Sequence, residues 1–442
     1  MLIAIWVKSV YNKKIKSEEP IMMKNIFFPG GVTLRCIQDT RFKQGILTVQ
    51  FVQPMAKETA ALNALIPAVL LRGCQGAEDL RKITLQLDDL YGAAVGVLVR
   101  RIGDYQTTGL SCSFLDDRFA LPGEQVLAPM VAFLEKLLFA PVTENGVFST
   151  EFVESEKKNL ISSIASQLNN KRAYASLALY RHMCREDSFG IPRLGSIADV
   201  KAITAQSAYD HYQALLRTSP VELFYVGAAD PETVAAHIGP MFEKISREPV
   251  ALPEQESFHS CGGGNFEETM AVSQGKLAMG YATEISLRDP RFAAMQVANT
   301  ILGGGMTSKL FVNIREKESL CYDISSSYSG AKGILTVQAG IDCDKMDAVQ
   351  EKVAAQLSAM ASGDITDQEL QSAKQALDAG LEAICDAPGS MESFFGVGVL
   401  SGLNRTPAQY RQEVAAVTRE DVAAAAKTII LDTVFCLKGE EV

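Results

Sequence analysis

Several features that would assign a function at once are missing from this 442-residue sequence. No apolar run approaches the ~20 residues that a membrane-spanning helix needs. Neither half carries a basic block, and 42 Lys and Arg against 52 Asp and Glu give a net charge of −10. There is no C-x-x-C pair, no G-x-S-x-G motif, and only four histidines. We therefore expect a protein that neither inserts into a membrane nor binds nucleic acid.

The cysteines show no pairing pattern. They are odd in number and widely scattered: Cys36, Cys74, Cys112, Cys184, Cys261, Cys321, Cys343, Cys385 and Cys436. Such usage is typical of a reducing compartment, where thiols act as small buried hydrophobes. It predicts a cytoplasmic protein without a disulfide framework.

The first 22 residues do not resemble the rest of the chain. Their apolar stretch, residues 2–7, is too short for the hydrophobic region of a signal peptide, and no small-residue cleavage site follows. We expect residues 1–22 to be disordered or to precede the true start, at Met22 or Met23.

The remaining chain has the composition of a folded protein, with 47% hydrophobic and 21% charged residues. Its clearest break is the Pro- and Gly-containing stretch 246–265, which lacks a sustained apolar period and is interpreted as a linker. This divides the protein into an N-terminal domain, residues 23–245, and a C-terminal domain, residues 266–442.

The two domains carry the same landmarks at a nearly constant offset. Gly45 and Gly275 open similar strand patterns 230 residues apart, and Tyr91 and Tyr322 precede pairs of strands 231 residues apart. The helical segments predicted between the strands are 60–71, 152–167, 207–216, 231–245, 292–302, 345–362, 367–385 and 421–430. Thr366 and Thr418 are expected to cap two of these helices, because each has an acid three residues later. The sequence thus predicts an α+β fold of two similar duplicated domains. Each would be a mainly antiparallel sheet with helices packed on it, and the domains would face each other across a cleft.

The second half also contains a longer signature. The segments 302–311 (LGGGMTSKLF), 314–317 (IREK) and 320–322 (LCY) resemble the pitrilysin/insulinase metallopeptidases, in particular the processing-peptidase-like subgroup. That group includes the mitochondrial processing peptidases and the core proteins of respiratory complexes. The resemblance covers residues 23–440.

Active members of this family bind zinc through H-x-x-E-H on a helix of the first half, with a Glu from a later helix. The two His share one helix face, and the Glu acts as general base. The matching positions here are Ala64, Pro67, Ala68 and, for the later Glu, Ser163. The resemblance therefore implies an inactive homologue that holds no metal, with zinc expected only in a catalytic partner. Pro67 also removes a helical hydrogen bond and favours a kink.

No other catalytic set replaces the missing motif. The histidines, His182, His211, His237 and His259, are far apart in sequence, and only His182 has a potential metal ligand, Glu186, at i+4. One such pair is more often two solvated side chains than a metal site. We expect that the chain alone does not hydrolyse peptides.

One element of the family's catalytic machinery remains. In active relatives an Arg and a Tyr seven residues apart support the scissile carbonyl and the neighbouring backbone, and Arg315 and Tyr322 match those positions. The alternative is a surface Arg and a structural Tyr, as Tyr91 indicates for the equivalent position. Gly303, Gly304 and Gly305 match a loop that helps to admit substrate in non-catalytic relatives, but a simple helix end fits them equally well.

Three functions follow. In the first, the chain is the non-catalytic subunit of a heterodimer with a homologous H-x-x-E-H subunit, and helps to bind and cleave a peptide there. In the second, it is a structural or assembly scaffold. In the third, it binds extended peptides at a sheet edge without any catalytic partner. The sequence favours the first, and leaves open whether self-pairing into a homodimer competes.

Overall fold

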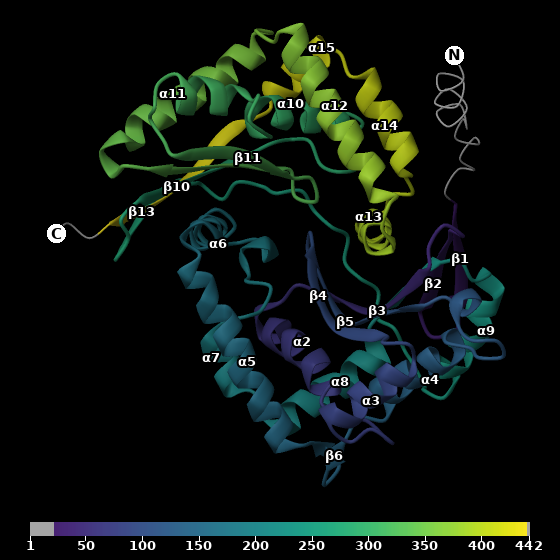
Figure 1. Ribbon diagram of the computed structural model, residues 1–442. Helices are drawn as coiled ribbons and strands as arrows, with labels where there is room; N and C mark the ends of the chain where they lie inside the picture. Colours follow the sequence, from purple (N-terminus) through teal and green to yellow (C-terminus); the bar gives the residue numbers. More distant parts are fainter. Residues whose placement is uncertain (1–21, 440–442) are drawn as a thin grey trace, which may run out of the picture.

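The computed structural model describes residues 22–439 and consists of two halves, one above the other (Figure 1). All but the last residue of the N-terminal segment discussed above lies outside the described residues. The first half contains a six-stranded sheet in the order β1-β2-β8-β3-β5-β4. Its strands are β1 (Met23–Phe28), β2 (Val32–Gln38), β3 (Gln44–Pro54), β4 (Ala94–Ile102), β5 (Tyr105–Leu115) and β8 (Val221–Gly227).

The second half repeats this arrangement with five strands. Their order is β11-β12-β10-β13-β9, formed by β9 (Gly264–Met270), β10 (Gly275–Ala282), β11 (Asp323–Ser329), β12 (Ile334–Ile341) and β13 (Ile430–Gly439). In each sheet the last strand of the half inserts between two earlier strands: β8 pairs in parallel with β2 and antiparallel with β3, and β13 pairs in parallel with β9 and antiparallel with β10. The predicted mainly antiparallel, duplicated fold is confirmed. β9 begins at Gly264, so the predicted linker was drawn two residues too long.

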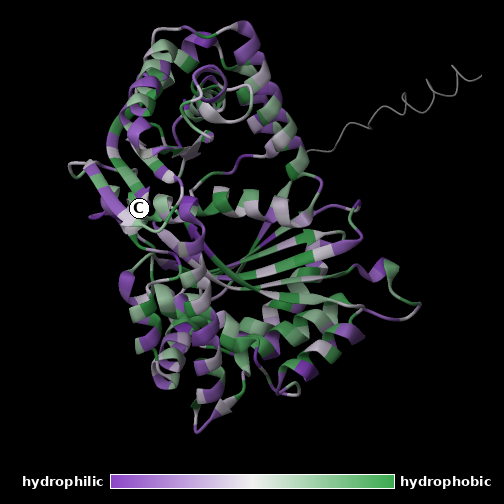
Figure 2. Cartoon of the chain, turned by 60° about the vertical axis from the view of Figure 1, so that its left-hand side comes forward, coloured by the Kyte–Doolittle hydropathy of each residue, from purple (hydrophilic) through white to green (hydrophobic). Residues whose placement is uncertain are grey.

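Helices cover the outer face of each sheet. The first half contains α2 (Lys57–Leu70), α3 (Leu80–Asp89), α4 (Leu127–Phe139), α5 (Thr150–Asn169), α6 (Lys171–Met183), α7 (Ile197–Ala202), α8 (Ala205–Thr218), α9 (Pro231–Glu243) and the small hairpin of β6 (Thr143–Glu144) and β7 (Val147–Phe148). Figure 2 shows hydrophobic residues along the strands of the first sheet, whereas hydrophilic residues recur on the outer helices. Alternate strand residues therefore enter a core between sheet and helices.

The second half follows the same plan. It contains α10 (Phe292–Gly303), the π-helix η3 (Leu310–Glu316), α11 (Met346–Ala361), α12 (Asp367–Ile384), α13 (Pro388–Leu400), α14 (Pro407–Ala416) and α15 (Arg419–Ala426). The expected caps of Thr366 and Thr418 are confirmed as capping boxes. The helix predicted over 421–430 is wrong at its end: α15 stops at Ala426, and Ile430 already pairs with Ala282 in the sheet.

One helix of each half packs on the sheet of the other half. Helix α6 lies on β10 and β13 of the second sheet, and α13 lies on β8 and β3 of the first (Figure 1). Both contacts are apolar: Leu179 of α6 packs with Phe435, and Phe395 of α13 packs with Phe224. Neither helix was predicted from the sequence. The inner face of each sheet is therefore partly covered by a helix of the opposite half.

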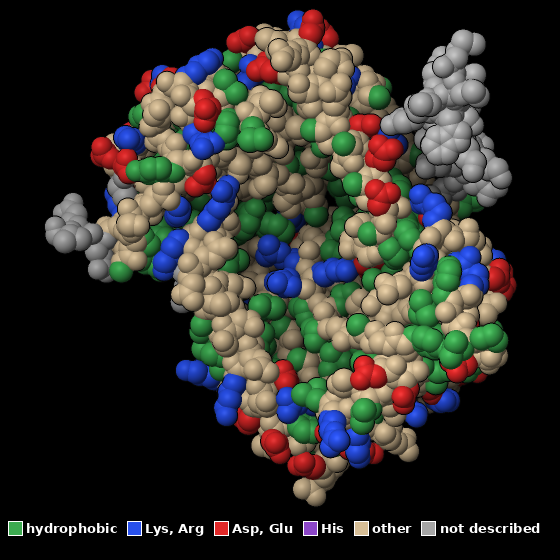
Figure 3. Space-filling model, viewed as in Figure 1, with side chains coloured by type: hydrophobic (Ala, Val, Ile, Leu, Met, Phe, Trp, Pro, Cys, Tyr) green, Lys and Arg blue, Asp and Glu red, His purple; other side chains and the backbone are tan. Residues whose placement is uncertain are grey.

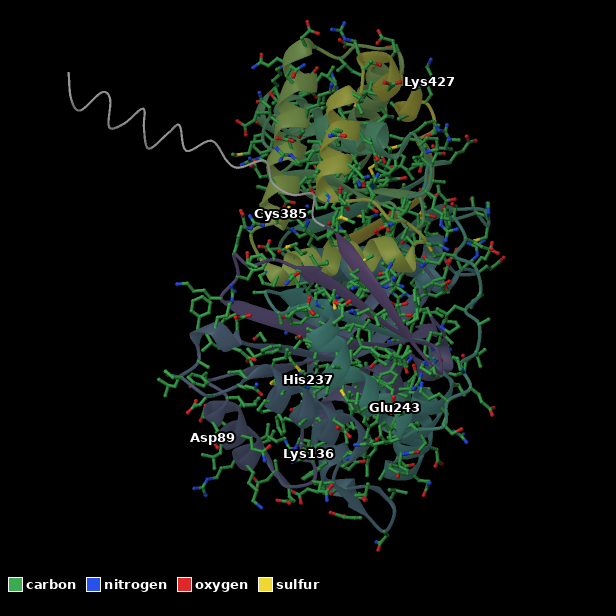
Figure 4. The ribbon with its side chains drawn as sticks, turned by 90° about the vertical axis from the view of Figure 1, so that its right-hand side faces the viewer. Asp89, Lys136, His237, Glu243, Cys385 and Lys427 are labelled. Carbon is green, nitrogen blue, oxygen red and sulfur yellow. The ribbon has the colours of Figure 1, made fainter. Side chains whose placement is uncertain are left out.

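The halves also meet at two hairpin turns. Lys332, in the β11–β12 turn, is 1% exposed, and its Nζ lies 2.8 Å from both Asp104 Oδ1 and Asp187 Oδ2 of the first half. Nearer the outer rim, Arg41 donates to the carbonyl of Cys385 (3.1 Å), which Figure 4 shows at the level where the halves meet. Among residues 22–439, no helix combines the length and hydrophobicity needed to cross a bilayer.

Candidate functional site

The positions predicted to match the family's zinc site lie on α2 and α5, which pack together. On α2, Ala64 and Pro67 are buried and Ala68 is half-buried. On α5, Ser163 is exposed and its hydroxyl donates to the carbonyl of Asn159, one turn earlier (3.0 Å). These four side chains offer no imidazole or carboxylate. Across the described part of the chain, no group of three His, Cys, Asp or Glu side chains is placed to hold a metal ion.

Pro67 is accommodated without ending α2. Because proline lacks an N–H, the carbonyl of Asn63, one turn earlier, has no helical partner at this position. The hydroxyl of Thr108, on β5, donates to that carbonyl at 2.5 Å. The sheet thus compensates for the hydrogen bond that the proline removes, and α2 continues to Leu70.

A hydrogen-bonded network occupies the space between α2, β5 and α8. The Asn63 side chain donates to Gln106 Oε1 (2.8 Å) and its Oδ1 lies 2.8 Å from His211 Nε2. Gln106 in turn donates to the carbonyls of Ala60 (3.1 Å) and Arg193 (2.7 Å). Burial lowers the pKa of His211, which favours a neutral imidazole. The interior beside α2 is thus a hydrogen-bonded polar network.

The other three histidines do not belong to any group of three potential metal ligands among the described residues. His182, on α6, stacks on Phe266 with ring centroids 4.0 Å apart, and burial lowers its pKa. His237 lies on α9 in the outer layer of the first half (Figure 4), and His259 is exposed in the connection between the halves. The i, i+4 pair of His182 and Glu186 gains no third ligand among the described residues.

Arg315 and Tyr322 lie together in the second half. Arg315 is near the end of η3, and Tyr322 directly precedes β11, where its N–H donates to the carbonyl of Gly340 (2.9 Å). Both side chains line one open cavity of about 400 Å³, together with Glu316, Ser319, Leu320, Cys321, Asp342 and Lys345. Tyr322 is 59% exposed. The two residues are therefore accessible from the same hollow.

Neighbouring side chains orient this pair. The Arg315 guanidinium lies over the ring of Phe311, 4.5 Å from its centroid. The Tyr322 hydroxyl donates to Asp342 Oδ1 (3.1 Å), and Asp342 Oδ2 accepts from Lys345 (3.0 Å). Hydrogen bonds from Lys345 and then Tyr322 hold the pKa of Asp342 below its usual value, so the carboxylate is charged. Sequence reasoning missed Asp342 and Lys345, because the strand β12 separates them from Tyr322.

The equivalent tyrosine of the first half has a different environment. Tyr91 has a positive φ of 60° and its hydroxyl donates to Glu124, while the same oxygen accepts from the N–H of Leu121 (2.8 Å). Tyr91 therefore fixes a loop of its own half. Tyr322 instead makes its side-chain hydrogen bond inside the open cavity.

The three glycines form the end of α10. Gly303 is buried, and a Cβ there would lie 2.4 Å from the backbone nitrogen of Ser326, so only glycine allows this approach. Gly304 caps the helix, and a Cβ on Gly305 would meet nothing within 4 Å. The next residue, Met306, is 77% exposed. Of the three glycines, only Gly304 and Gly305 are thus exposed to a ligand.

Comparisons with known proteins agree with this architecture. The family profile described as "Peptidase M16 inactive domain" matches residues 202–377. The probable inactive metalloprotease YmfF of Bacillus subtilis (strain 168) is 28% identical over 412 residues, covering 93% of this chain and 97% of YmfF.

Solved structures give the same result. A conserved protein from Enterococcus faecalis V583 superimposes with a TM-score of 0.87 at 29% identity, covering 95% of this chain and 99% of that chain. The peptidase M16 inactive domain from Pseudomonas fluorescens shares the fold, with a TM-score of 0.79 at 19% identity over 95% and 98% of the two chains. Over residues 202–377 the chain matches the inactive-domain profile of the M16, or pitrilysin/insulinase, metallopeptidase family, and over nearly its whole length it is similar to a probable inactive member of that family.

Proposed function

We propose that this chain is the non-catalytic subunit of a zinc metallopeptidase-type heterodimer. A homologous subunit with an intact H-x-x-E-H motif would hold the metal, and this chain would close on the peptide and present Arg315 and Tyr322. One observation supports the proposal: both side chains line one open cavity, while the positions predicted to match the zinc site are Ala64, Pro67, Ala68 and Ser163. A chain that lacks zinc ligands but keeps the Arg and Tyr of the active site is what we expect if two subunits share one active site.

The chemistry of the pair suits such a role. Zinc in the partner would activate the attacking water. The Arg315 guanidinium stays charged and can donate to an oxygen that gains negative charge at the scissile carbonyl. Tyr322 can turn its hydroxyl from Asp342 to a peptide carbonyl at little cost, because Asp342 keeps its bond to Lys345. Gly304 and Gly305 leave room for the peptide backbone beside the end of α10.

The second candidate is a scaffold or a peptide-binding protein without any peptidase role. It is favoured by the tight connection of the halves through α6, α13 and the buried Lys332. Such a rigid body would serve as a structural subunit without using Arg315 or Tyr322.

A pulldown distinguishes these candidates. The tagged chain is recovered from cells that naturally produce it, and the complex is assayed for cleavage of a quenched peptide library with and without a metal chelator. We expect an H-x-x-E-H subunit in the complex and cleavage that the chelator stops. Cleavage should fall strongly with Arg315→Ala or Tyr322→Phe.

Matched controls are available in the first half. Tyr91→Phe alters the equivalent tyrosine, and Arg81→Ala removes an exposed arginine on α3; both should leave cleavage unchanged. Recovery of the chain without a peptidase, or cleavage indifferent to Arg315 and Tyr322, would refute the shared site and favour the scaffold.

A further inference from the structure

A hollow between the two halves is lined by positive charge. Figure 3 shows Lys and Arg side chains gathered on its floor, over β4 and between α6 and α13, with few acidic side chains beside them. This contrasts with the chain as a whole, which carries a net charge of −10. A recessed surface of one sign concentrates its field, so the hollow attracts ligands of opposite charge despite the acidic exterior.

Strand β4 borders this surface and carries two arginines. It is the edge strand of the first sheet and pairs only with β5. Arg100 and Arg101 are the two residues before its last, and Arg193, from the loop before α7, donates to the carbonyl of Val99. Arg193 thus lies against β4 two residues before Arg101. The free edge of β4 is thus flanked by guanidinium groups.

The charges of these arginines are unequally balanced. Arg100 forms two hydrogen bonds with Glu392 of α13, at 2.9 and 2.8 Å, and is neutralised by it. Among the described residues, Arg101 donates to the backbone carbonyls of Phe189 (2.7 Å) and Ile191 (3.1 Å), and it lies 3.9 Å from the centre of the Phe189 ring.

No carboxylate of residues 22–439 forms an ion pair with Arg101 or with Arg193. Asp187, which also acts on Arg101, is bound to Lys332. Arg193 is exposed, and apart from its bond to Val99 its guanidinium nitrogens have no hydrogen-bond partner among the described residues. Two neighbouring cations without a counter-charge repel each other, and a carboxylate between them would remove that repulsion.

We propose that the hollow beside β4 binds an acidic peptide segment, whose Asp or Glu side chains pair with Arg101 and Arg193. This inference rests on the proposed function only in taking a peptide as the ligand; it adds the chemical class of that peptide. Arginine suits the role, because its planar guanidinium matches a carboxylate through two parallel hydrogen bonds. Because Arg193 already donates to the carbonyl of Val99, the selection rests on the arginine side chains and not on the backbone of β4.

Fluorescence anisotropy of the isolated chain tests the proposal. Labelled peptides of equal length, rich in Glu, Gln or Lys, are titrated with the full-length protein, and an oligodeoxynucleotide of equal charge serves as a second anion. We expect the Glu peptide to bind about tenfold or more tightly than the Gln peptide, with weakening in salt. The Lys peptide and the oligodeoxynucleotide should bind more weakly than the Glu peptide.

Variants locate the site. Arg193→Glu should reduce affinity for the Glu peptide by about tenfold or more and shift preference toward the Lys peptide. Arg101→Gln should weaken the same interaction, and thermal unfolding checks that it folds. The control Arg81→Gln/Lys427→Gln removes two exposed charges on the outer layers (Figure 4 shows Lys427) and should change nothing.

Each result supports or overturns the proposal. Equal binding of Glu and Gln peptides, stronger binding of the oligodeoxynucleotide, or unchanged binding by Arg193→Glu would overturn it. The assay needs no partner subunit, so its failure is distinct from that of the heterodimer proposal. Selective binding without recovery of a peptidase would refute the heterodimer alone.

Discussion

The helices α6 and α13 are equivalent elements of the two halves, and each packs on the sheet of the opposite half. Helix α6 contributes a cation to this contact, whereas α13 contributes an anion. Arg172, on α6, donates to Asp323 (2.7 Å) in the second half, and its side chain is 42% exposed. Glu392, on α13, is fully buried and accepts from Arg100, Thr48 and Gln50 of the first half. A half-exposed pair retains water as an alternative partner, whereas a buried one does not. We infer that the ion pair of α13 contributes more to the stability of the fold than the ion pair of α6.

The largest effect is expected for Glu392→Ala. It leaves the guanidinium of Arg100 and the amide of Gln50 facing an apolar helix, which should lower the free energy of unfolding by about 3–5 kcal/mol. Urea unfolding followed by circular dichroism measures this. Glu382→Ala, an exposed glutamate on the preceding helix, is the control and should cost little. A loss for Glu392→Ala below about 1 kcal/mol would contradict the comparison.

A slightly smaller loss in the free energy of unfolding, about 3 kcal/mol, is expected for Lys332→Met. This substitution leaves the carboxylates of Asp104 and Asp187 without their shared cationic partner. Burial alone would raise the pKa of Asp104, but hydrogen bonds from Lys332 and Ser188 hold it below 3.8. Burial would lower the pKa of Lys332, but the two aspartates hold it above 10.5. The stabilisation is therefore fully present between these values. It is lost as the pH falls through the lowered pKa of Asp104 or rises through the raised pKa of Lys332.

Unfolding of the native chain and of Lys332→Met across pH gives the test. The difference between them should be constant around neutral pH and should shrink toward both extremes. A difference that persists in strong acid would show that the methionine acts through packing and not through the aspartates.

An intermediate effect concerns α2, whose counterpart in the second half, α10, contains no proline. Thr108→Val removes the hydroxyl that serves the carbonyl of Asn63, and should cost about 1 kcal/mol. In a Pro67→Ala background that carbonyl regains its helical N–H, so the same substitution should cost less. A double-mutant cycle measures the coupling. Equal costs in the two backgrounds would refute compensation by Thr108.

The smallest loss is expected for Arg172→Ala, the counterpart of Glu392→Ala. Its partners can turn to water, so the free energy of unfolding should fall by about 1 kcal/mol or less. The effect should diminish in high salt, because part of it is an exposed ion pair. If urea unfolding gave a loss as large as that of Glu392→Ala, the contrast between the two helices would not hold.

Much of the fold could be predicted, because local sequence patterns determine it. The repeat of Gly45 and Gly275 marks corresponding strands β3 and β10, and the capping residues Thr366 and Thr418 begin their helices as expected. These features depend on residues a few positions apart. The assignment of Ala64, Pro67, Ala68 and Ser163 to the zinc positions stays a prediction, and the structure places these residues on α2 and α5. Arg315 and Tyr322 share a cavity, as their spacing suggested, although their use remains a proposal.

The helices that cross between the halves could not be predicted in this way. Helix α13 is apolar on most sides and contains three glycines, so it lacks the periodicity of a surface helix, for the reason that it is enclosed. The sequence by itself determined two similar α+β halves and the absence of an H-x-x-E-H motif. Only the tertiary structure decided the burial of Glu392 and Lys332, the Thr108 bond to Asn63, and the basic hollow beside β4. Each of these depends on partners far apart in the chain, and their pairing is fixed only when the halves pack.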